Sequence, residues 1–349
     1  MLTINKIFII IILPNIKILL IKKMNKEKKK MRKSINTEHI EGRVYQHSLE
    51  LKETGPNSKN PGTKYISGNL NIAVDEDGMN VITIHFTYVT AVTSKGNKNS
   101  TFTTLNKIID NPENTWITGG KENAFKVKVD TSLALNDFYA NDGTLVSTKR
   151  NEGGFVSFAN ELCPIEDRNT FQMDMVINRV QRVEADEEKG IKEDYLKLCG
   201  AVFNFKNDLL PVEFIVKNVT GIVYFENLDI SPKNIVYTKV WGHINNQVLR
   251  TPKVEESAFG STFVTTQERQ IREWVVTGTA KVPYDFGDES VLTEKELTEA
   301  MQNREVYLAD VKKRQDEYNA SKQASATSSA LNTATATATA AVKNGDFSF

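Results

Sequence analysis

The feature that most constrains the fold is a strand–turn–strand pattern that occurs twice, in the same order, along the chain. Residues 62–90 read GTKYISGNLNIAVDEDGMNVITIHFTYVT, and residues 194–219 read DYLKLCGAVFNFKNDLLPVEFIVKNV. On both sides of each turn apolar residues alternate with polar ones, which is the period of half-buried strands. Upstream, the segment 42–45 (GRVY) is matched by 178–181 (NRVQ). Because a repeat sets the number of folded units, we expect two small β-rich units in tandem.

Alternation also assigns the two faces of the strand at 81–89. The apolar face ends in Phe86 and Tyr88 and is predicted to be core. The opposite face carries His85 and Thr87 and is polar enough to meet solvent or a ligand. A plain antiparallel hairpin with one solvated face would show the same pattern.

The order of elements in the first unit is strand, strand, strand, short helix, strand, strand. The helix is expected at 100–110, where apolar residues follow a 3.6 period and Ser100 stands at the capping position. This is the element order of an OB-fold, a five-stranded Greek-key barrel. The expected fold is therefore mainly β: tandem OB-like five-stranded barrels with a C-terminal helix and a disordered tail. The predicted boundaries are a non-globular basic and apolar leader at 1–39, a first barrel at 40–165, a second barrel at 166–290, a helix at 291–320 and a tail at 321–349.

The two ends of the chain differ from the barrels in composition. Residues 7–21 are apolar but are broken by Pro14 and Lys17, so they fall short of the ~20 residues of a membrane span. One interpretation is a translation start downstream, with residues 1–30 dispensable for folding; the other is a membrane anchor.

Near the other end, Thr293 and Glu296 form a capping box. Leu297, Met301 and Tyr318 lie on an apolar stripe that is expected to pack on the second barrel. Residues 320–341 are almost entirely Ala, Thr and Ser and cannot build a core.

Composition excludes several function classes. Lys+Arg and Asp+Glu both number 44, so any basic surface must be local rather than global. Cys163 and Cys199 stand in unrelated contexts, as reduced thiols of a cytosolic protein do. The four histidines form no HxxxH or His/Cys pattern, so no metal site and no cofactor are expected. No nucleophile–base pair or carboxylate dyad has a telling spacing, so the chain is not predicted to be an enzyme.

Together, the OB-like units, the low-complexity linker and the C-terminal tip GDFSF resemble the single-stranded DNA-binding proteins of bacteria and phages. The resemblance implies sequence-tolerant binding and protection of single-stranded DNA during DNA replication or recombination, in the cytoplasm (the host cytoplasm for a phage protein). It implies a tip, with Asp346, Phe347 and Phe349, that binds replication or recombination proteins; a tail without a partner is the alternative. A β-rich phage structural or virion-assembly protein is the other function considered, followed by an N-terminally anchored surface protein.

OB barrels hold a single strand with basic residues along the phosphates and aromatic residues stacked on bases. In the first barrel the residues expected to do so are Arg43, Tyr45, Lys64, Tyr65, His85, Thr87, Lys126, Lys128, Arg150 and Phe155. In the second barrel they are Arg179, Lys217, Trp241 and Trp274. Each of the two tryptophans is either a core residue or an exposed stacking surface.

Overall fold

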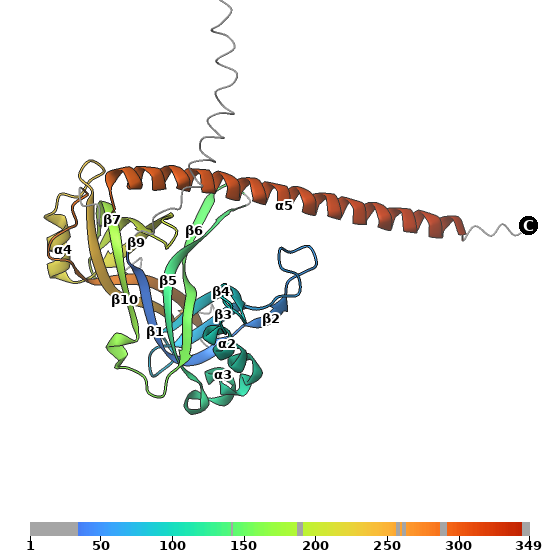
Figure 1. Cartoon of the computed structure of the whole chain (residues 1–349), viewed down its shortest axis with the longest axis horizontal. Coiled ribbons are helices and arrows are strands. Elements are labelled where there is room, and N and C mark those ends of the chain that lie inside the picture. Colours follow the sequence, from blue (N-terminus) through green and yellow to red (C-terminus); the bar gives the residue numbers. More distant parts are fainter. Residues whose placement is uncertain are drawn as a thin grey trace, which may run out of the picture.

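The computed structural model describes residues 34–140, 142–186, 191–255, 259, 263–286 and 292–343. The expectations for residues 1–33 of the leader and for the tip with Asp346, Phe347 and Phe349 lie outside these residues, whereas residues 36–39 of the predicted leader belong to the first strand, Asn36–His47. The described chain is mainly β and ends in a long helix (Figure 1). No helix among the described residues has the length and apolar character needed to cross a membrane.

The first half of the chain closes a ring of strands. Its members are β1 (Asn36–His47), β3 (Lys64–Ala73), β4 (Val81–Thr90), β5 (Lys126–Tyr139) and β6 (Leu145–Phe158). β1 pairs with β3, β3 with β4, β6 with β5 and β5 with β1, all antiparallel, and a short parallel pairing of β4 with β6 completes the ring. Helix α2 (Ser100–Asp110) lies between β4 and β5 in the chain and buries Leu105 and Ile108. Smaller elements are β2 (Glu50–Glu53), η1 (Pro112–Asn114), α3 (Trp116–Gly119) and η2 (Lys121–Asn123).

The second half repeats this plan. After η3 (Ile165–Asp167) its strands are β7 (Asn169–Val183), β8 (Tyr195–Phe203), β9 (Leu209–Val216), β10 (Val236–Glu255) and β11 (Phe263–Thr279). The pairings β7–β8, β8–β9, β9–β11, β11–β10 and β10–β7 match those of the first ring, including the parallel one between the third and fifth strands. Helix α4 (Val219–Glu226) occupies the place of α2. The prediction of tandem OB-like five-stranded barrels is confirmed.

Strand β1 joins the two rings into one sheet. Along one edge it pairs first with β7, through residues 36–40, and then with β3, through residues 43–47. Along the other edge it pairs with β5. Glu38 is thus in register with Thr131 of one ring and Phe171 of the other. A single cluster of buried apolar residues runs through both rings.

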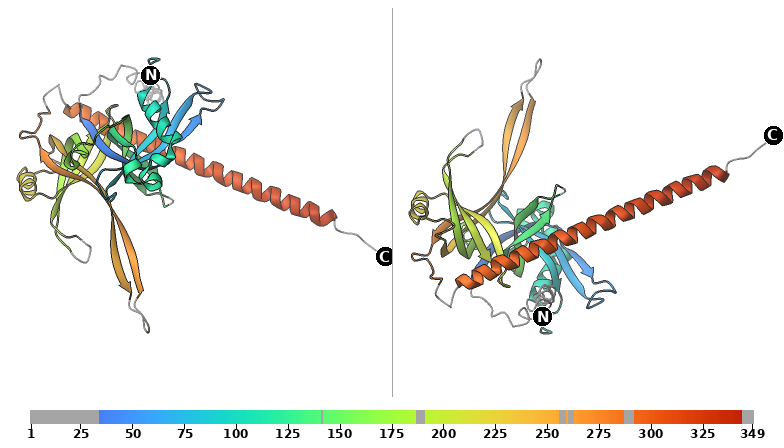
Figure 2. Two further views of the ribbon diagram at one scale, coloured as in Figure 1. Left: turned by 90° about the horizontal axis from the view of Figure 1, so that it is seen from below. Right: turned by 90° about the horizontal axis from the view of Figure 1, so that it is seen from above.

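Helix α5 (Glu294–Lys343) begins with the predicted capping box. The Thr293 N–H donates to Glu296 Oε2 at 3.0 Å, and the Glu296 N–H donates to Thr293 Oγ1 at 3.3 Å. Further along, both terminal nitrogens of Arg304 donate to the carboxylate of Asp137, at 2.8 and 2.6 Å. The helix then continues beyond the body of the molecule (Figure 2).

Three features of α5 differ from the prediction. The helix does not stop near residue 320 but runs to Lys343, because alanine has the highest helix propensity and extending a formed helix needs no new nucleus. Of the predicted apolar stripe Leu297 is buried, whereas Met301 and Tyr318 are exposed. The stripe was also expected to pack on the second barrel, whereas the Arg304–Asp137 pair ties α5 to β5 of the first ring.

Tyr88 was predicted to face the core, and a β-bulge between β3 and β4 explains why it does not. Phe86 is buried as predicted, but 49% of Tyr88 is exposed. In register, Gly68 faces Phe86 and Ile66 faces Val89, so β4 has two residues opposite one of β3. The extra residue reverses the alternation beyond it.

The predicted capping residue of α2 is wrong by one position. The Asn99 side chain, not Ser100, caps the helix by accepting from the Thr101 N–H at 3.1 Å.

A buried carboxyl group marks the junction of the rings. Glu38 is 1% exposed, and its Oε1 accepts a hydrogen bond from Trp274 Nε1 of β11 at 3.1 Å. Its Oε2 has no hydrogen-bond partner among the described residues. Burial raises the pKa of Glu38 to about 8, so the carboxyl group is largely protonated at neutral pH.

Replacing this carboxyl group tests the junction. Since the folded chain binds a proton at Glu38 between pH 4.5 and about 8 and the unfolded chain does not, the wild-type free energy of unfolding should lose a few kcal/mol across that window. Glu38→Gln keeps an acceptor for Trp274 and does not titrate. Denaturant unfolding at pH 5 and pH 8 should show similar stabilities at pH 5 and a more stable variant at pH 8. Parallel pH profiles would contradict the buried, protonated state of Glu38.

The docking of α5 is tested at Arg304. Only 10% of the Arg304 side chain and 1% of the Asp137 side chain are exposed, so Arg304→Ala leaves a buried carboxylate unpaired, at a cost on the order of 3 kcal/mol. We expect faster amide hydrogen exchange through residues 294–315. Arg314→Ala is the matched control, because its pair with Asp310 is exposed and worth at most about 0.5 kcal/mol. Equal exchange in the two variants would show that the Arg304 pair does not hold the helix.

Candidate nucleic-acid interface

A cleft opens between the outer face of the first ring and the β10–β11 ribbon of the second. Its volume is about 490 Å³, within the range of about 300–1,000 Å³ of sites that hold small molecules. We call it the cationic cleft. Its lining residues are Asn69, Thr83, His85, Asn136, Thr148, Lys149, Arg150, Asn151, Ile244, Asn245, Asn246, Arg272 and Trp274. None of them is a carboxylate.

The two walls of the cationic cleft are fixed by direct contacts. On β4, Ile82 and Ile84 are fully buried, so Thr83 between them points outward into the cleft. Opposite, the Asn246 N–H donates to Asn80 Oδ1 at 3.0 Å, and Asn246 Nδ2 donates to the Val81 carbonyl at 2.5 Å. The width of the cleft is therefore set by hydrogen bonds between the rings.

His85 contributes a neutral imidazole. Its Nδ1 lies 2.8 Å from Asn69 Oδ1; an amide oxygen only accepts, so Nδ1 carries the proton and Nε2 is left as an acceptor. Burial, and then the charge of Arg150, lower the pKa of His85, against an opposing effect of Glu152. This acceptor is suited to an amino group of a base.

Lys149 is a largely buried cation at the floor of the cleft. Its Nζ donates to the Glu213 carbonyl at 2.6 Å and lies 4.6 Å from the centre of the Trp274 ring. Burial lowers the pKa of Lys149 to about 8, although Glu213 and Glu273 act in the opposite direction. The site holds an ammonium group whose charge is only partly balanced, and an anion in the cleft would stabilise that charge.

The two arginines of the cleft have only weak or neutral partners among the described residues. Arg150 approaches Glu152 only at 3.5 Å, and its Nε is buried without a partner among the described residues. Arg272 is exposed. Guanidinium groups bind phosphate in bidentate fashion, so the cleft has the chemistry to hold a phosphate backbone.

A second hollow has a volume of about 800 Å³. Glu38, whose carboxyl group accepts the hydrogen bond from Trp274, is one of its lining residues. We call it the aromatic hollow because Phe155 and Trp241, which are 75% and 38% exposed, line it. Asp130 and Glu152 also line it. Aromatic rings there can stack on bases, but the carboxylates disfavour phosphate.

The structure brings only part of the predicted site together. Three of the predicted residues (His85, Arg150 and Trp274) line the cationic cleft. Phe155 and Trp241 line the aromatic hollow. Of the two tryptophans, Trp274 is the buried one, at 4% exposed.

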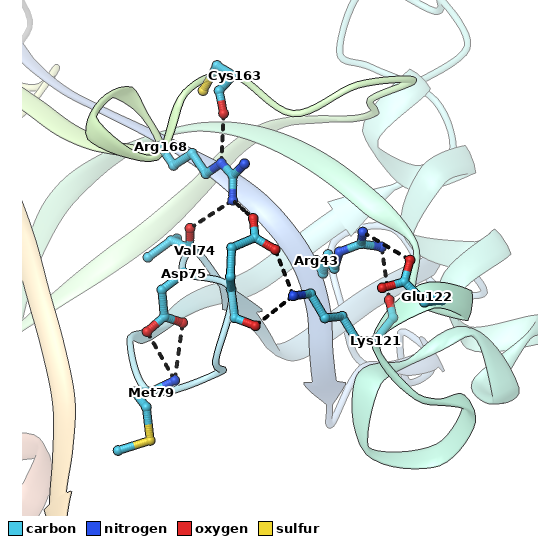
Figure 3. A network of polar contacts seen from close by, with 9 residues as sticks. Arg43, Val74, Asp75, Met79, Lys121, Glu122, Cys163 and Arg168 are labelled. Carbon is cyan, nitrogen blue, oxygen red and sulfur yellow. Dashed lines mark hydrogen bonds and ion pairs between the residues drawn. The ribbon is translucent and has the colours of Figure 1, made fainter.

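Other predicted residues of the first ring lie elsewhere. Lys126 and Lys128 are on the outward face of β5 and line neither cavity. Arg43 donates to the Lys121 carbonyl at 2.9 Å and approaches Glu122, as Figure 3 shows.

Contacts with nearby side chains occupy several of the remaining predicted residues. The ring of Tyr45 lies 6.1 Å from that of Trp116, and Thr87 donates to Glu152 at 3.2 Å. Lys64 and Tyr65 begin β3, where the ring of Tyr65 lies 4.6 Å from that of Tyr88.

In the second ring two predicted cations have partners of their own. Lys217 pairs with Glu273 at 2.9 Å. Arg179 lies 3.5 Å from the sulfur of Cys199. Neither lines the cationic cleft.

Sequence reasoning missed much of the lining of the cleft. Alternation alone puts Asn69 and Thr83 on the outward face of their hairpin, so that signal was present in the sequence. Lys149, Asn246 and Arg272 gave no such signal, because nothing in the sequence shows that the β10–β11 ribbon faces the first ring.

Comparison with known proteins places the chain in a family. No curated protein has a significant sequence match to it. Among solved structures it is similar to a deletion mutant of the single-stranded DNA-binding protein from Thermus aquaticus, with 12% sequence identity and a TM-score of 0.42 over 73% of this chain and 98% of that one. The family model YorF matches residues 34–314. Since this match covers well over half of the sequence, the chain belongs to the YorF family.

Proposed function

We propose that the protein binds single-stranded DNA without enzymatic activity or sequence preference, and that it protects the strand during DNA replication or recombination in the cytoplasm. One observation carries the proposal: a cleft on the outer face of an OB-type ring is lined by Lys149, Arg150 and Arg272 and by no carboxylate. OB-folds bind oligonucleotides on the face of their second and third strands. In the first ring these strands are β3 and β4, which supply Asn69, Thr83 and His85 to the cleft.

The cationic cleft accounts for strand binding by a chain of zero net charge. Phosphate attraction depends on local charge, and here it is concentrated between two walls that exclude part of the solvent. The amides of Asn136 and Asn245, which also line the cleft, can donate to or accept from any base. Such contacts discriminate little between bases, in keeping with sequence-tolerant binding.

The path of the strand continues from the cleft along the β3–β4 hairpin. His85 pairs in register with Asn69 inside the cleft, and Tyr65 pairs with Thr90 toward the other end of the same hairpin. There the rings of Tyr65 and Tyr88 lie 4.6 Å apart, and 49% of Tyr88 is exposed. A base stacked on such a ring contributes about 1–3 kcal/mol. The C-terminal tip, with Asp346, Phe347 and Phe349, is proposed to contact replication or recombination proteins.

Removing the cleft arginines should weaken binding at every sequence. Arg150→Gln with Arg272→Gln removes two phosphate contacts, so the slope of log K against log salt should fall in magnitude by about 1.4. The measurement is fluorescence anisotropy of labelled poly-dT at four salt concentrations.

The matched control for the arginine pair is Lys126→Gln with Lys128→Gln, two basic residues of the same ring outside both cavities. We expect this control to keep the wild-type slope. A reduced slope in the lysine variant together with a wild-type slope in the arginine variant would place the strand on β5 and overturn the cleft assignment.

Lys149 gives the proposed binding a pH dependence. Its pKa of about 8 means that the free protein loses this charge between pH 7 and pH 9, so affinity for poly-dT should fall several-fold over that range. Lys149→Arg stays charged throughout and should bind with little dependence on pH. If wild type and variant show the same decline, the titrating group is not Lys149.

A further inference from the structure

A histidine, a carboxylate and a thiol meet where β1 touches the connection between the two rings. His39 and Glu41 are two positions apart on β1 and share its outer face, because Ile40 between them is fully buried. Cys163 belongs to the connection that follows β6. One ligand atom of each residue lies within 4.8 Å of the ligand atoms of the other two.

The spacing suits a tetrahedral metal ion. Zinc binds imidazole nitrogen, carboxylate oxygen and thiolate sulfur at about 2.0–2.3 Å, which puts neighbouring ligand atoms about 3.3–3.8 Å apart. His39 Nε2 and Glu41 Oε2 are 3.5 Å apart. This pair therefore already has the separation of two zinc ligands, and the thiol sulfur lies within 4.8 Å of both atoms.

A second carboxylate contacts the other ring nitrogen of His39 and fixes the orientation of the ring. Its Nδ1 lies 2.9 Å from the carboxylate of Asp130, its register partner on β5. A carboxylate that accepts from one ring nitrogen fixes the tautomer and leaves the other nitrogen as a metal ligand, an arrangement typical of zinc sites. Here that other nitrogen, Nε2, faces Glu41.

The cysteine is held by its backbone on both sides. The Cys163 N–H donates to Glu41 Oε1 at 2.6 Å. Figure 3 shows the contact on the other side, in which the Cys163 carbonyl accepts from Arg168 Nε at 2.7 Å. Arg168 is itself 8% exposed and paired with Glu76 at 2.8 Å. Ion pairing explains a histidine between two carboxylates, but it does not explain why a thiol is placed beside them.

We propose that His39, Glu41 and Cys163 bind one divalent transition-metal ion of the zinc class, with Asp130 as the positioning residue for His39. A thiolate and an imidazole favour such ions over Mg²⁺ or Ca²⁺. The ion would fasten the connection that carries Cys163 to β1, the strand that joins the first ring to the second. This inference is independent of strand binding.

The wild-type chain provides the first test. After treatment with a chelator and dialysis, Co²⁺ should bind at one equivalent and give a thiolate-to-cobalt charge-transfer band in the near ultraviolet, and Zn²⁺ should displace it. Zn²⁺ should also protect Cys163, but not Cys199, from alkylation by iodoacetamide. Absence of the charge-transfer band, or equal alkylation of Cys163 with and without Zn²⁺, would overturn the proposal.

Variants identify the ligands. Cys163→Ser should lose the charge-transfer band, whereas Cys199→Ser, the matched control, should keep it. Asp130→Asn should weaken Co²⁺ binding by about 10–100-fold with the band retained. Thermal melting of each metal-free variant checks that it folds like the metal-free wild type. A band that persists unchanged in Cys163→Ser would also refute the site.

Discussion

The architecture depends on one strand that serves two rings. Over residues 38–40, β1 is hydrogen-bonded to β5 on one side and to β7 on the other, so the first strands of the two rings hold them together in one continuous sheet. β1 and β7 are the first strands of their rings and run antiparallel to each other. Equivalent strands paired in this way relate the two rings by an approximate two-fold axis near Glu38 and Phe171. The gap between the rings follows from that pairing, and the cationic cleft lies in it.

Burial near the junction of the two rings shifts the pKa values of two ionisable side chains, Glu38 and Lys149. Glu38 is kept uncharged by its surroundings, and Lys149 keeps its charge less readily than an exposed lysine. The indole of Trp274 lies between them, bonded to Glu38 through Nε1 and facing the Lys149 ammonium with its ring. The protonation of Glu38 and the charge of Lys149 therefore both act on the side chain of Trp274.

Local patterns in the sequence predicted much of the fold. The repeated hairpin predicted the two rings, the 3.6-residue period of apolar residues predicted α2, and the capping box predicted the start of α5. These signals need only near neighbours in the chain. The bulge that exposes Tyr88 depends on the partner strand, and the cleft depends on which outward faces meet across the gap. His85 and Arg150 could thus be named as candidates, while Arg272 could not be assigned to the same site.

The proposed metal site was likewise beyond the reach of local sequence patterns. His39 and Glu41 are visible in the sequence as a pair on one strand face, but Cys163 is 122 residues from Glu41. Spacing rules that look for histidines and cysteines close together in the chain find nothing there. Only the closure of the first ring, which returns the chain to β1 after β6, brings the thiol to the pair.

The straightness of α5 sets distances for anything attached to its end. A helix of 50 residues is about 75 Å long, and roughly 40 Å of it extends past Gln315, which still accepts from the Tyr139 N–H at 2.9 Å. A rigid rod of that length works as a spacer rather than a tether. The far end of α5 is therefore held about 40 Å from its last contact with the first ring.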